Sequence, residues 1–321
     1  MTEEWVEANS VKLRELLDIS VKKNLSDCIL FSGGLDTSVV AAIASSYTQL
    51  TGVTVSFHDA PDVPYAKLIA QEFGMNHIIV KVGEEDVKEA AVDVVRIMKS
   101  FDPMEVRNDA SIIIGLRAAN RLGFRDVMTG DAGDELFAGY SFFFNLTRHV
   151  LERNLQNMWR IMRFASKPLA ESLGMEAKLP FLDDADFKEF AMKIPIQWKV
   201  REERNKIYGK WILRKAFEGI LPEEITWRMK VPIEQGSGTS TFSQCLEKKI
   251  TDIDFDTDRN AILEGDGVRI RDKEQLFYFR IYKKEFGSPR DYGDGPKPCP
   301  GCGAHVASEI NFCRTCGAYP I

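Results

Sequence analysis

The chain has 321 residues, and 44% of them are hydrophobic, enough for one large core or for a core with a smaller satellite. Its formal net charge of −6 excludes a uniformly basic nucleic-acid-binding protein, although a local basic patch is compatible with that total. The sequence has no apolar run of about eighteen residues and no signal-peptide pattern at its start, so we expect no membrane span.

The cysteines are unevenly distributed. Four of the six lie within the last 23 residues, while Cys28 and Cys245 stand alone. Disulfides dispersed through a secreted domain would give a different pattern. We therefore expect a reducing compartment and a cytoplasmic protein.

The first 130 residues alternate between helical and strand patterns. Apolar residues at helical spacing between Val11 and Val21 predict a helix over residues 3–23. Strands are predicted at 27–31, 52–57, 77–82 and 126–129, and further helices at 37–47, 63–74, 84–99 and 109–122. This alternation predicts an α/β fold with a parallel sheet, which binds ligands at the carboxyl ends of its strands.

The remaining sequence has a different character. Residues 134–286 are mostly helical in pattern, and residues 287–298 are rich in Gly, Pro and Asp, as a linker would be. We predict four segments: an N-terminal helix at 1–24, one large domain at 25–286, a linker at 287–298 and a small terminal module at 299–321.

A glycine-rich loop directly follows the first strand and opens the next helix, with the sequence Ser32-Gly33-Gly34-Leu35-Asp36-Thr37-Ser38. Its two glycines let the backbone approach an anion, and the helix N-terminus favours negative charge. The hydroxyls add donors, whereas Asp36 needs a cation such as Mg²⁺ between itself and a phosphate. The alternative is a glycine turn with capping residues for the helix.

The loop is not the P-loop of kinases and GTPases, because no Gly-Lys-Ser/Thr follows. It resembles the pyrophosphatase loop of the N-type ATP pyrophosphatase superfamily, whose members split ATP between the α and β phosphates and transfer AMP. The resemblance implies an adenine-nucleotide α-hydrolase-like (HUP) domain that uses ATP and Mg²⁺. It also implies nucleotide binding by Ser32, Gly33, Gly34, Asp36, Thr37 and Ser38.

A second glycine-rich stretch follows the fourth strand, Thr129-Gly130-Asp131-Ala132-Gly133-Asp134-Glu135-Leu136-Phe137-Ala138-Gly139-Tyr140. Acids packed this closely repel one another unless a cation or donors compensate, and helix capping accounts for Asp134 alone. The stretch resembles the Ser-Gly-Glu-Gly-Ser-Asp-Glu-X-Phe-Gly-Gly-Tyr signature of asparagine synthetases, whose family includes β-lactam synthetase. By resemblance, Gly130 and Asp134 bind the nucleotide, and Asp134 is a Mg²⁺ ligand opposite Asp36.

One position in this signature departs from the family. Asp131 stands where asparagine synthetases carry a Glu near the reacting substrate, and its side chain is one methylene shorter. Because of this departure, the resemblance specifies the ATP chemistry more closely than the identity of the substrate.

Later stretches extend the resemblance in the same order. Residues 174–183 resemble the family's Glu-Ala-Arg-Val-Pro-Phe-Leu-Asp segment, with Lys178 in place of Arg, and Lys210-X-X-X-Arg214 lies in a stretch typical of the family. Trp227-Arg228-Met229-Lys230 resembles its Trp-Arg-X-Lys.

Two residues in these stretches are catalytic candidates. The resemblance makes Lys230 a catalytic lysine, and an ammonium suits that task because it stabilises charge developing at phosphorus. The alternative is a solvated surface lysine. Asp183 either orients a substrate amine or caps the helix that follows it.

The cysteine tail carries two Cys-X-X-Cys pairs, Cys299 with Cys302 and Cys313 with Cys316. Two such pairs offer four thiolates to one tetrahedral Zn²⁺, which leaves no open position for catalysis. The tail resembles small zinc-ribbon modules, so we predict a structural zinc that drives the folding of the tail. A redox dithiol pair is the alternative.

The leading hypothesis is an AMP-forming ligase that adenylates a small carboxylate and transfers nitrogen to it, with aspartate to asparagine as the first guess. Asparagine synthetases of this family carry an N-terminal glutaminase with a Cys directly after Met1, whereas position 2 here is Thr. We therefore expect free ammonia, an ammonia-supplying partner protein or another nucleophile.

Two alternatives stay open. Superfamily relatives adenylate tRNA bases, and several carry zinc ribbons, so an RNA-modifying enzyme would hold RNA through the tail. Residues 199–230 contain nine Lys or Arg and five Glu, a modest basic excess. Against this reading, tRNA thiolation enzymes usually have Lys after the loop's two glycines, where this chain has Leu35. The third hypothesis, a non-catalytic nucleotide sensor, is disfavoured by Asp36, Asp134 and Lys230.

Overall fold

The computed structural model describes residues 3–293 and 295–321. Residues 1, 2 and 294, which belong to the predicted N-terminal segment and linker, lie outside the described residues. None of the described helices is long and apolar enough to cross a membrane.

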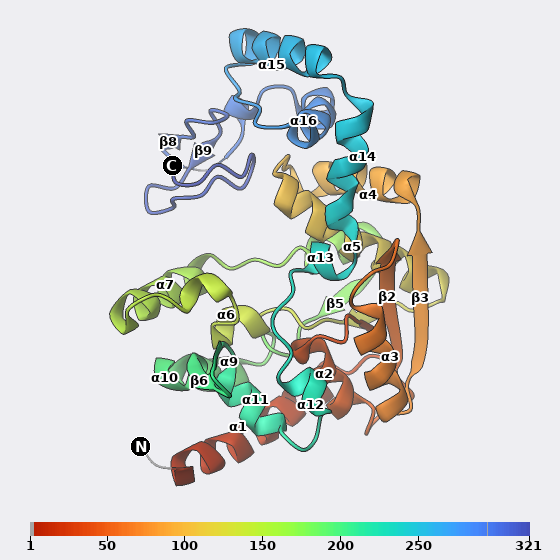
Figure 1. The fold of residues 1–321 in the computed structure, drawn as a ribbon, viewed down its shortest axis with the longest axis vertical. Helices are drawn as coiled ribbons and strands as arrows, with labels where there is room; N and C mark the ends of the chain where they lie inside the picture. Colours follow the sequence, from red (N-terminus) through yellow and green to blue (C-terminus); the bar gives the residue numbers. More distant parts are fainter. Residues whose placement is uncertain (1–2, 294) are drawn as a thin grey trace. The chain divides into compact units, whose positions relative to one another are not determined.

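A five-stranded sheet lies at the centre of the α/β part (Figure 1), in the order β3-β2-β1-β4-β5. Its strands are β1 (Cys28–Leu30), β2 (Thr51–Phe57), β3 (Asn76–Val82), β4 (Asp126–Met128) and β5 (Glu176–Lys178). β1 pairs in parallel with β2 and with β4, and β4 pairs in parallel with β5. The predicted α/β fold with a parallel sheet is confirmed.

The strand order reverses at β1. From β1 the chain builds β2 and β3 on one side and then returns to place β4 and β5 on the other. In an open α/β sheet, ligands bind at such a switch point, outside the carboxyl ends of the two central strands. Both glycine-rich motifs begin at this point, because residues 32–34 follow β1 and residues 129–133 follow β4.

Helices connect and cover the strands. The first five are α1 (Glu3–Lys23), α2 (Leu35–Ala44), α3 (Val63–Glu72), α4 (Glu84–Met98) and α5 (Pro103–Arg121). The helix predicted to start at residue 109 begins six residues earlier, at Pro103, because proline suits the first turn of a helix. The other helices are α6 (Gly133–Phe137), α7 (Arg148–Ile161), α8 (Ser166–Ser172), α9 (Ala185–Lys193), α10 (Ile196–Lys199), α11 (Trp211–Phe217), α12 (Glu223–Thr226), α13 (Ile233–Gly236), α14 (Phe242–Lys249), α15 (Asp252–Asp266) and α16 (Lys273–Phe286), with 3-10 turns at Ser141–Phe143, Thr239–Thr241 and Pro289–Asp291.

The region predicted to be mostly helical also contains strands. Besides β5, it holds a hairpin of β6 (Arg201–Glu203) and β7 (Lys206–Tyr208), whose turn residues Arg204 and Asn205 both have positive φ. Neither strand of the hairpin has the alternating apolar pattern by which strands are predicted, since all three residues of β6 are charged and β7 places Ile207 directly beside Tyr208.

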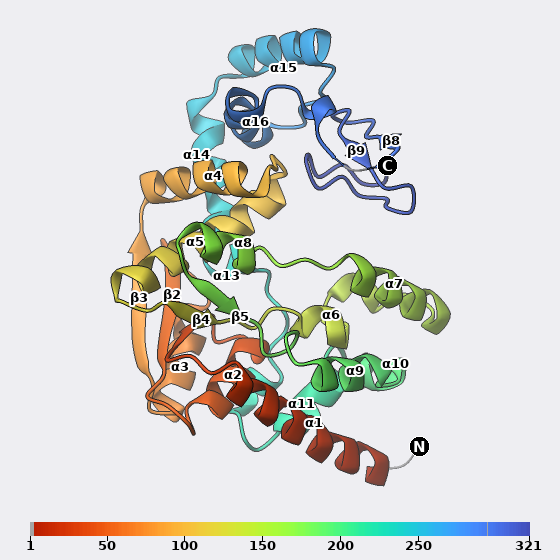
Figure 2. The same ribbon diagram turned by 180° about the vertical axis from the view of Figure 1, so that it is seen from behind.

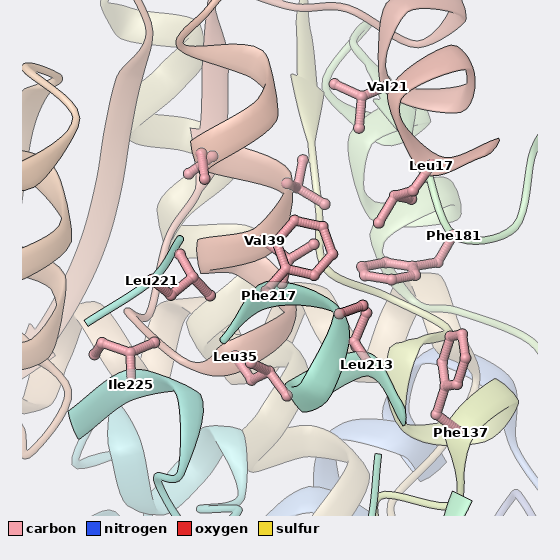
Figure 3. Close-up of a cluster of buried hydrophobic side chains, with 14 of the residues drawn as sticks. Leu17, Val21, Leu35, Val39, Phe137, Phe181, Leu213, Phe217, Leu221 and Ile225 are labelled. Atoms are coloured by element: carbon pink, nitrogen blue, oxygen red, sulfur yellow. The ribbon is translucent and has the colours of Figure 1, made fainter. Parts of the chain in front are cut away.

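The described chain forms two compact units. Unit 1 comprises residues 3–55, 61–80 and 115–232, and unit 2 comprises residues 56–60, 81–114, 233–293 and 295–321. In unit 1, the apolar faces of α1, α2 and α11 meet around Leu17, Val39 and Phe217, all fully or almost fully buried (Figure 3). Figure 2 shows α1 alongside α2, α9 and α11, which it contacts.

Unit 2 packs α4, α14 and α16 around an aromatic cluster. The ring of Phe101 meets Phe279 and Tyr282 at centroid distances of 5.2 and 5.1 Å. The chain ends in a small module with the two-stranded sheet of β8 (Lys297–Pro298) and β9 (His305–Val306).

Candidate active site and metal centre

The loop after β1 is shaped for close approach. Gly33 has φ +65°, and a Cβ at this position would overlap the backbone of Tyr65 and Ala66 in α3. The Ser32 hydroxyl lies 3.2 Å from that of Thr37 and accepts a 3.2 Å hydrogen bond from the Gly34 N–H. The helix that follows begins at Leu35, directly after the two glycines, so this loop leads into a helix N-terminus as predicted from the sequence.

The second motif closes against the first. A Cβ on Gly130 would lie 2.9 Å from the Thr37 side chain and 3.0 Å from the Asp36 Cβ, and a Cβ on Gly133 would overlap the Asp36 carboxylate. The glycines of the 129–140 stretch are therefore needed to bring the two strand ends together. Ala132 adopts a left-handed φ of 74° at the start of α6, which turns the chain so that Asp134 lies on its first turn.

A lysine joins the two predicted magnesium ligands. The Nζ atom of Lys210 contacts Asp36 Oδ2 and lies 2.6 Å from Asp134 Oδ1. All three side chains are largely buried, with Lys210 only 4% exposed. A Cβ on Gly139 would overlap both Asp134 and Lys210, which explains a glycine there. The predicted proximity of Asp36 and Asp134 is observed, since both touch one nitrogen.

Lys230 completes this cluster. Its Nζ lies 2.6 Å from Asp134 Oδ2 and 5.7 Å from the centre of the Tyr140 ring. Burial alone would lower the pKa of Lys230, but the Asp134 and Asp36 carboxylates outweigh it and hold that pKa above its usual range. Lys230 is therefore a fixed positive charge at the switch point.

The two carboxylates differ in their electrostatic balance. Burial and the neighbouring Asp134 raise the pKa of Asp36, although Lys210 opposes this. Burial also acts on Asp134, but two adjacent ammonium groups, those of Lys210 and Lys230, hold its pKa below the usual range.

Two buried arginines fix the segment that carries Lys230. The Arg228 guanidinium bonds Asp62 at 2.6 Å and lies 3.7 Å from the centre of the Tyr65 ring. Arg214 donates to the carbonyls of Gly209, Thr226 and Arg228 at 2.9, 2.6 and 2.9 Å. One side chain on α11 thereby holds the backbone beside both Lys210 and Lys230.

The substrate-side candidate Asp131 is buried and oriented by a hydroxyl. The Ser166 hydroxyl, at the start of α8, donates to Asp131 Oδ2. Burial raises the pKa of Asp131, which the bond from Ser166 partly offsets. Ser166 was not a candidate from the sequence, because no motif singles out a lone serine thirty-odd residues away.

Asp183 lies in a local turn. Its carboxylate accepts a 2.9 Å hydrogen bond from the Leu179 N–H and pairs with Lys167 at 2.7 Å. The residue that caps α9 is Asp184, whose side chain accepts from the Phe187 N–H. The capping role considered for Asp183 therefore belongs to its neighbour.

The cluster suits a hard cation. Asp36 Oδ1 and the fully buried Ser38 Oγ have no hydrogen-bond partner within the described parts of the chain. Mg²⁺ prefers carboxylate oxygens as ligands, and Asp36 has one oxygen left for it. Lys210 is the residue that sequence reasoning missed. It lay in a quoted stretch, but its buried position between the acids has no signature in the local sequence.

The four tail cysteines converge. All four are buried, and one ligand atom from each lies within 4.8 Å of the others. The Sγ atoms of Cys299 and Cys316 are 3.7 Å apart, as are those of Cys302 and Cys313. Thiolates bound about 2.3 Å from a central tetrahedral ion would stand about 3.8 Å apart, so the set fits Zn²⁺.

A parallel sheet with a phosphate-type loop and paired carboxylates at its switch point defines an ATP-pyrophosphatase-like α/β domain. The model of the asparagine synthase family matches residues 12–173 and 148–291. The chain belongs to the asparagine synthase family.

Two asparagine synthetases among the named relatives agree with this assignment. Asparagine synthetase B [glutamine-hydrolyzing] of Escherichia coli is 27% identical over 89% of this chain and 57% of its own length. The asparagine synthetase [glutamine-hydrolyzing] of Sandersonia aurantiaca is 29% identical over 70% of this chain and 47% of its own. The chain thus spans about half the length of these relatives. The structure of NMN synthetase from Francisella tularensis covers 88% of the chain at TM-score 0.40 and 13% identity.

Proposed function

We propose that the chain is an AMP-forming, ATP-dependent ligase that adenylates a small carboxylate and transfers nitrogen to it, with aspartate to asparagine as the first candidate reaction. The observation that carries the proposal is the contact of one Lys210 ammonium with both Asp36 and Asp134. Carboxylates from two strand ends thus share one cation position at the switch point of the sheet.

The residues divide into three tasks. Ser32, Gly33, Gly34 and Thr37 bind the phosphates, and Ser38 and Gly130 complete the nucleotide-binding set. Asp36 and Asp134 would hold Mg²⁺, which neutralises the charge of the departing pyrophosphate when it is bound. Lys230 remains charged and stabilises the negative charge that develops around the α-phosphorus.

The chemistry proceeds in two balanced steps. A substrate carboxylate oxygen attacks the α-phosphorus, the bond to the bridging oxygen breaks, and pyrophosphate leaves with its electron pair. A nitrogen nucleophile then attacks the activated carbonyl carbon, AMP leaves, and the nitrogen loses a proton. Asp131, held by Ser166, is our first candidate to bind the substrate's ammonium group. Asp183 is our second candidate for orienting a substrate amine.

The nitrogen source is part of the proposal. The relatives named above are glutamine-hydrolyzing, and this chain aligns with about half of each. We propose that the described domain accepts ammonia itself, delivered free or by a partner protein. The zinc in the four-cysteine module is structural in this scheme.

An ATP–pyrophosphate exchange assay with a panel of amino acids and with tRNA tests the proposal. We expect aspartate to support exchange, and Lys230→Met to lower the rate by about 100-fold or more. Lys206→Met, an exposed lysine of the β6–β7 hairpin, is the matched control and should leave the rate unchanged. If tRNA supports exchange and none of the amino acids does, the chain is an RNA-modifying enzyme and not this ligase. Failure of every substrate would favour a nucleotide sensor.

A further inference from the structure

Helix α7 presents a basic face in an otherwise acidic protein. Residues 141–167 contain five Lys or Arg and a single Glu, whereas the whole chain has a net charge of −6. His149, Arg153, Gln156 and Arg160 lie at positions i, i+4, i+7 and i+11, which form one stripe along the helix, and all four are exposed. Arg163, just beyond the end of α7, is exposed as well.

Two of these five cations form ion pairs within the described protein, and three do not. Arg148 pairs with Glu152 at 3.1 Å, and Lys167 pairs with Asp183 at 2.7 Å. Arg153, Arg160 and Arg163 form no ion pair with any residue that the structure describes. Three unpaired guanidinium groups on one short segment leave a positive patch that suits a polyanion.

The opposite face of α7 is anchored to the signature helix α6. Leu151 and Leu155 are buried in a small cluster with Phe143. The Trp159 indole donates a 2.9 Å hydrogen bond to the carbonyl of Glu135, the residue after Asp134. Figure 1 shows α7 directly beside α6. The basic stripe therefore faces solvent from a helix whose position is fixed relative to the candidate active site.

An exposed aromatic ring lies one stacking contact away from the candidate site. Phe142 is 62% exposed, yet its ring stacks on Tyr140 with centroids 5.3 Å apart and planes 11° apart. Tyr140 in turn faces Lys230. An aromatic ring that is held in place and left open is a stacking platform for an unpaired base, which binds with little dependence on sequence.

The zinc module offers much less positive charge. Residues 295–321 contain Lys297 and Arg314 as the cations and Glu309 as the acid. The Lys297 ammonium already donates to the carbonyl of Ile321 at 2.6 Å. Phosphate contacts dominate nucleic-acid affinity, so the segment with more free cations is the better RNA contact.

From the unpaired arginines of α7 and the open ring of Phe142, we propose that this face binds single-stranded RNA. Arg153, Arg160 and Arg163 would each contact a phosphate, with about 10 Å along the helix axis between Arg153 and Arg160. Phe142 would stack on a base at the end nearest Lys230. This binding does not depend on which substrate the site adenylates, and its test does not use catalysis.

The test measures binding of a fluorescent oligo(U) and of a folded tRNA to the full chain by anisotropy at several salt concentrations. The triple variant Arg153→Glu, Arg160→Glu, Arg163→Glu is compared with Lys67→Glu, Arg121→Glu, Arg125→Glu, which changes three other exposed cations of unit 1 by the same total charge. We expect the α7 variant to lose at least 10-fold in affinity. Its log–log salt slope should fall by about 2, since each single-strand phosphate contact contributes about 0.7.

Phe142→Ala adds a charge-neutral arm. We expect it to weaken binding roughly 5- to 100-fold while leaving the salt slope unchanged, because stacking carries no counterion release. Circular dichroism checks that the exposed substitutions leave the fold intact.

Four outcomes would overturn the proposal. The wild-type chain could fail to bind oligo(U), or both triple variants could lose the same affinity. If only the double variant Lys297→Glu, Arg314→Glu lost affinity for oligo(U), the RNA contact would lie in the zinc module. If polyglutamate competes as well as oligo(U) and Phe142→Ala has no effect, the surface is a docking site for an acidic protein.

Discussion

At the residue scale, the candidate site depends on a buried charge cluster in which ammonium and carboxylate groups are equal in number. Two carboxylates, Asp36 and Asp134, face two ammonium groups, Lys210 and Lys230. Two buried carboxylates this close would repel one another strongly. Lys210 removes this repulsion and so stabilises the two glycine-rich loops. A divalent cation between the carboxylates would remove the repulsion equally well. Because Lys210 contacts both predicted magnesium ligands, we expect it to compete with Mg²⁺ for the position between them.

Lys210→Met tests this competition. Removing one partner of a buried ionic cluster costs about 3–5 kcal/mol, so we expect a lower urea midpoint for the variant. Millimolar Mg²⁺ should restore part of that loss, because the cation can then lie between the two carboxylates, while the wild-type midpoint changes little. All five tryptophans belong to unit 1, so their fluorescence follows this unit alone. Equal responses of both proteins to Mg²⁺ would contradict the competition.

Gly139 tests the packing of the same cluster. A Cβ at this position would overlap the Asp134 carboxylate and the Lys210 side chain. We expect Gly139→Ala to lower ATP–pyrophosphate exchange by at least about 100-fold, since displaced catalytic groups lose their alignment. Gly265→Ala in α15 is the matched control, because no atom lies within 4 Å of its added Cβ. Unchanged exchange in Gly139→Ala would show that the cluster tolerates a shift.

At the element scale, the strands and helices with regular apolar spacing could be predicted from the sequence. The strands β1 to β4 and helices α1 to α5 follow from apolar spacing and from glycine-rich breaks, and the two loops follow from motif order. β5 was not predicted as a strand, because Glu176–Lys178 is three residues long and gains its place from pairing with β4. The positions of Lys210 and Ser166 depend on packing between distant elements, which no local pattern encodes.

A buried lysine between α10 and α6 should make the stability of the folded chain depend on pH. Lys199 ends α10, is 1% exposed, and donates to the Leu136 carbonyl at 2.7 Å. Burial lowers its pKa to about 7, against about 10.4 in an unfolded chain. Between these values the unfolded chain binds more protons, so raising the pH stabilises the folded form.

Comparison with Lys199→Met isolates this effect. From pH 7 to pH 9.5 we expect the free energy of unfolding of the wild type to rise by up to about 3 kcal/mol relative to the variant. Urea titrations followed by tryptophan fluorescence at both pH values measure the difference. A gap between the two proteins that does not change with pH would mean that Lys199 titrates normally in the folded chain.

At the scale of the whole molecule, the zinc module is part of unit 2 and not a free tail. The Phe101 N–H donates to the Thr315 carbonyl at 2.7 Å, and the Arg269 N–H donates to the Gly301 carbonyl at 2.8 Å. Arg271 and Gln275, around the start of α16, both donate to the Cys316 carbonyl, at 2.9 and 2.8 Å. Each of these acceptors lies within or next to a Cys-X-X-Cys turn, and in the proposed scheme these turns keep their shape through a metal shared by the four thiolates.

Loss of zinc should therefore expose specific amides in unit 2 and leave unit 1 intact. We expect Cys313→Ser with Cys316→Ser to raise hydrogen exchange in peptides that contain Phe101 and Arg269, because their acceptors lie in the zinc module. The urea midpoint from tryptophan fluorescence, which reports on unit 1, should stay unchanged. Cys245→Ser, a half-buried cysteine of α14 outside the cluster, is the control. If both amides stay as protected in the double variant as in the wild type, the module keeps its fold without metal, and its four buried cysteines need another explanation.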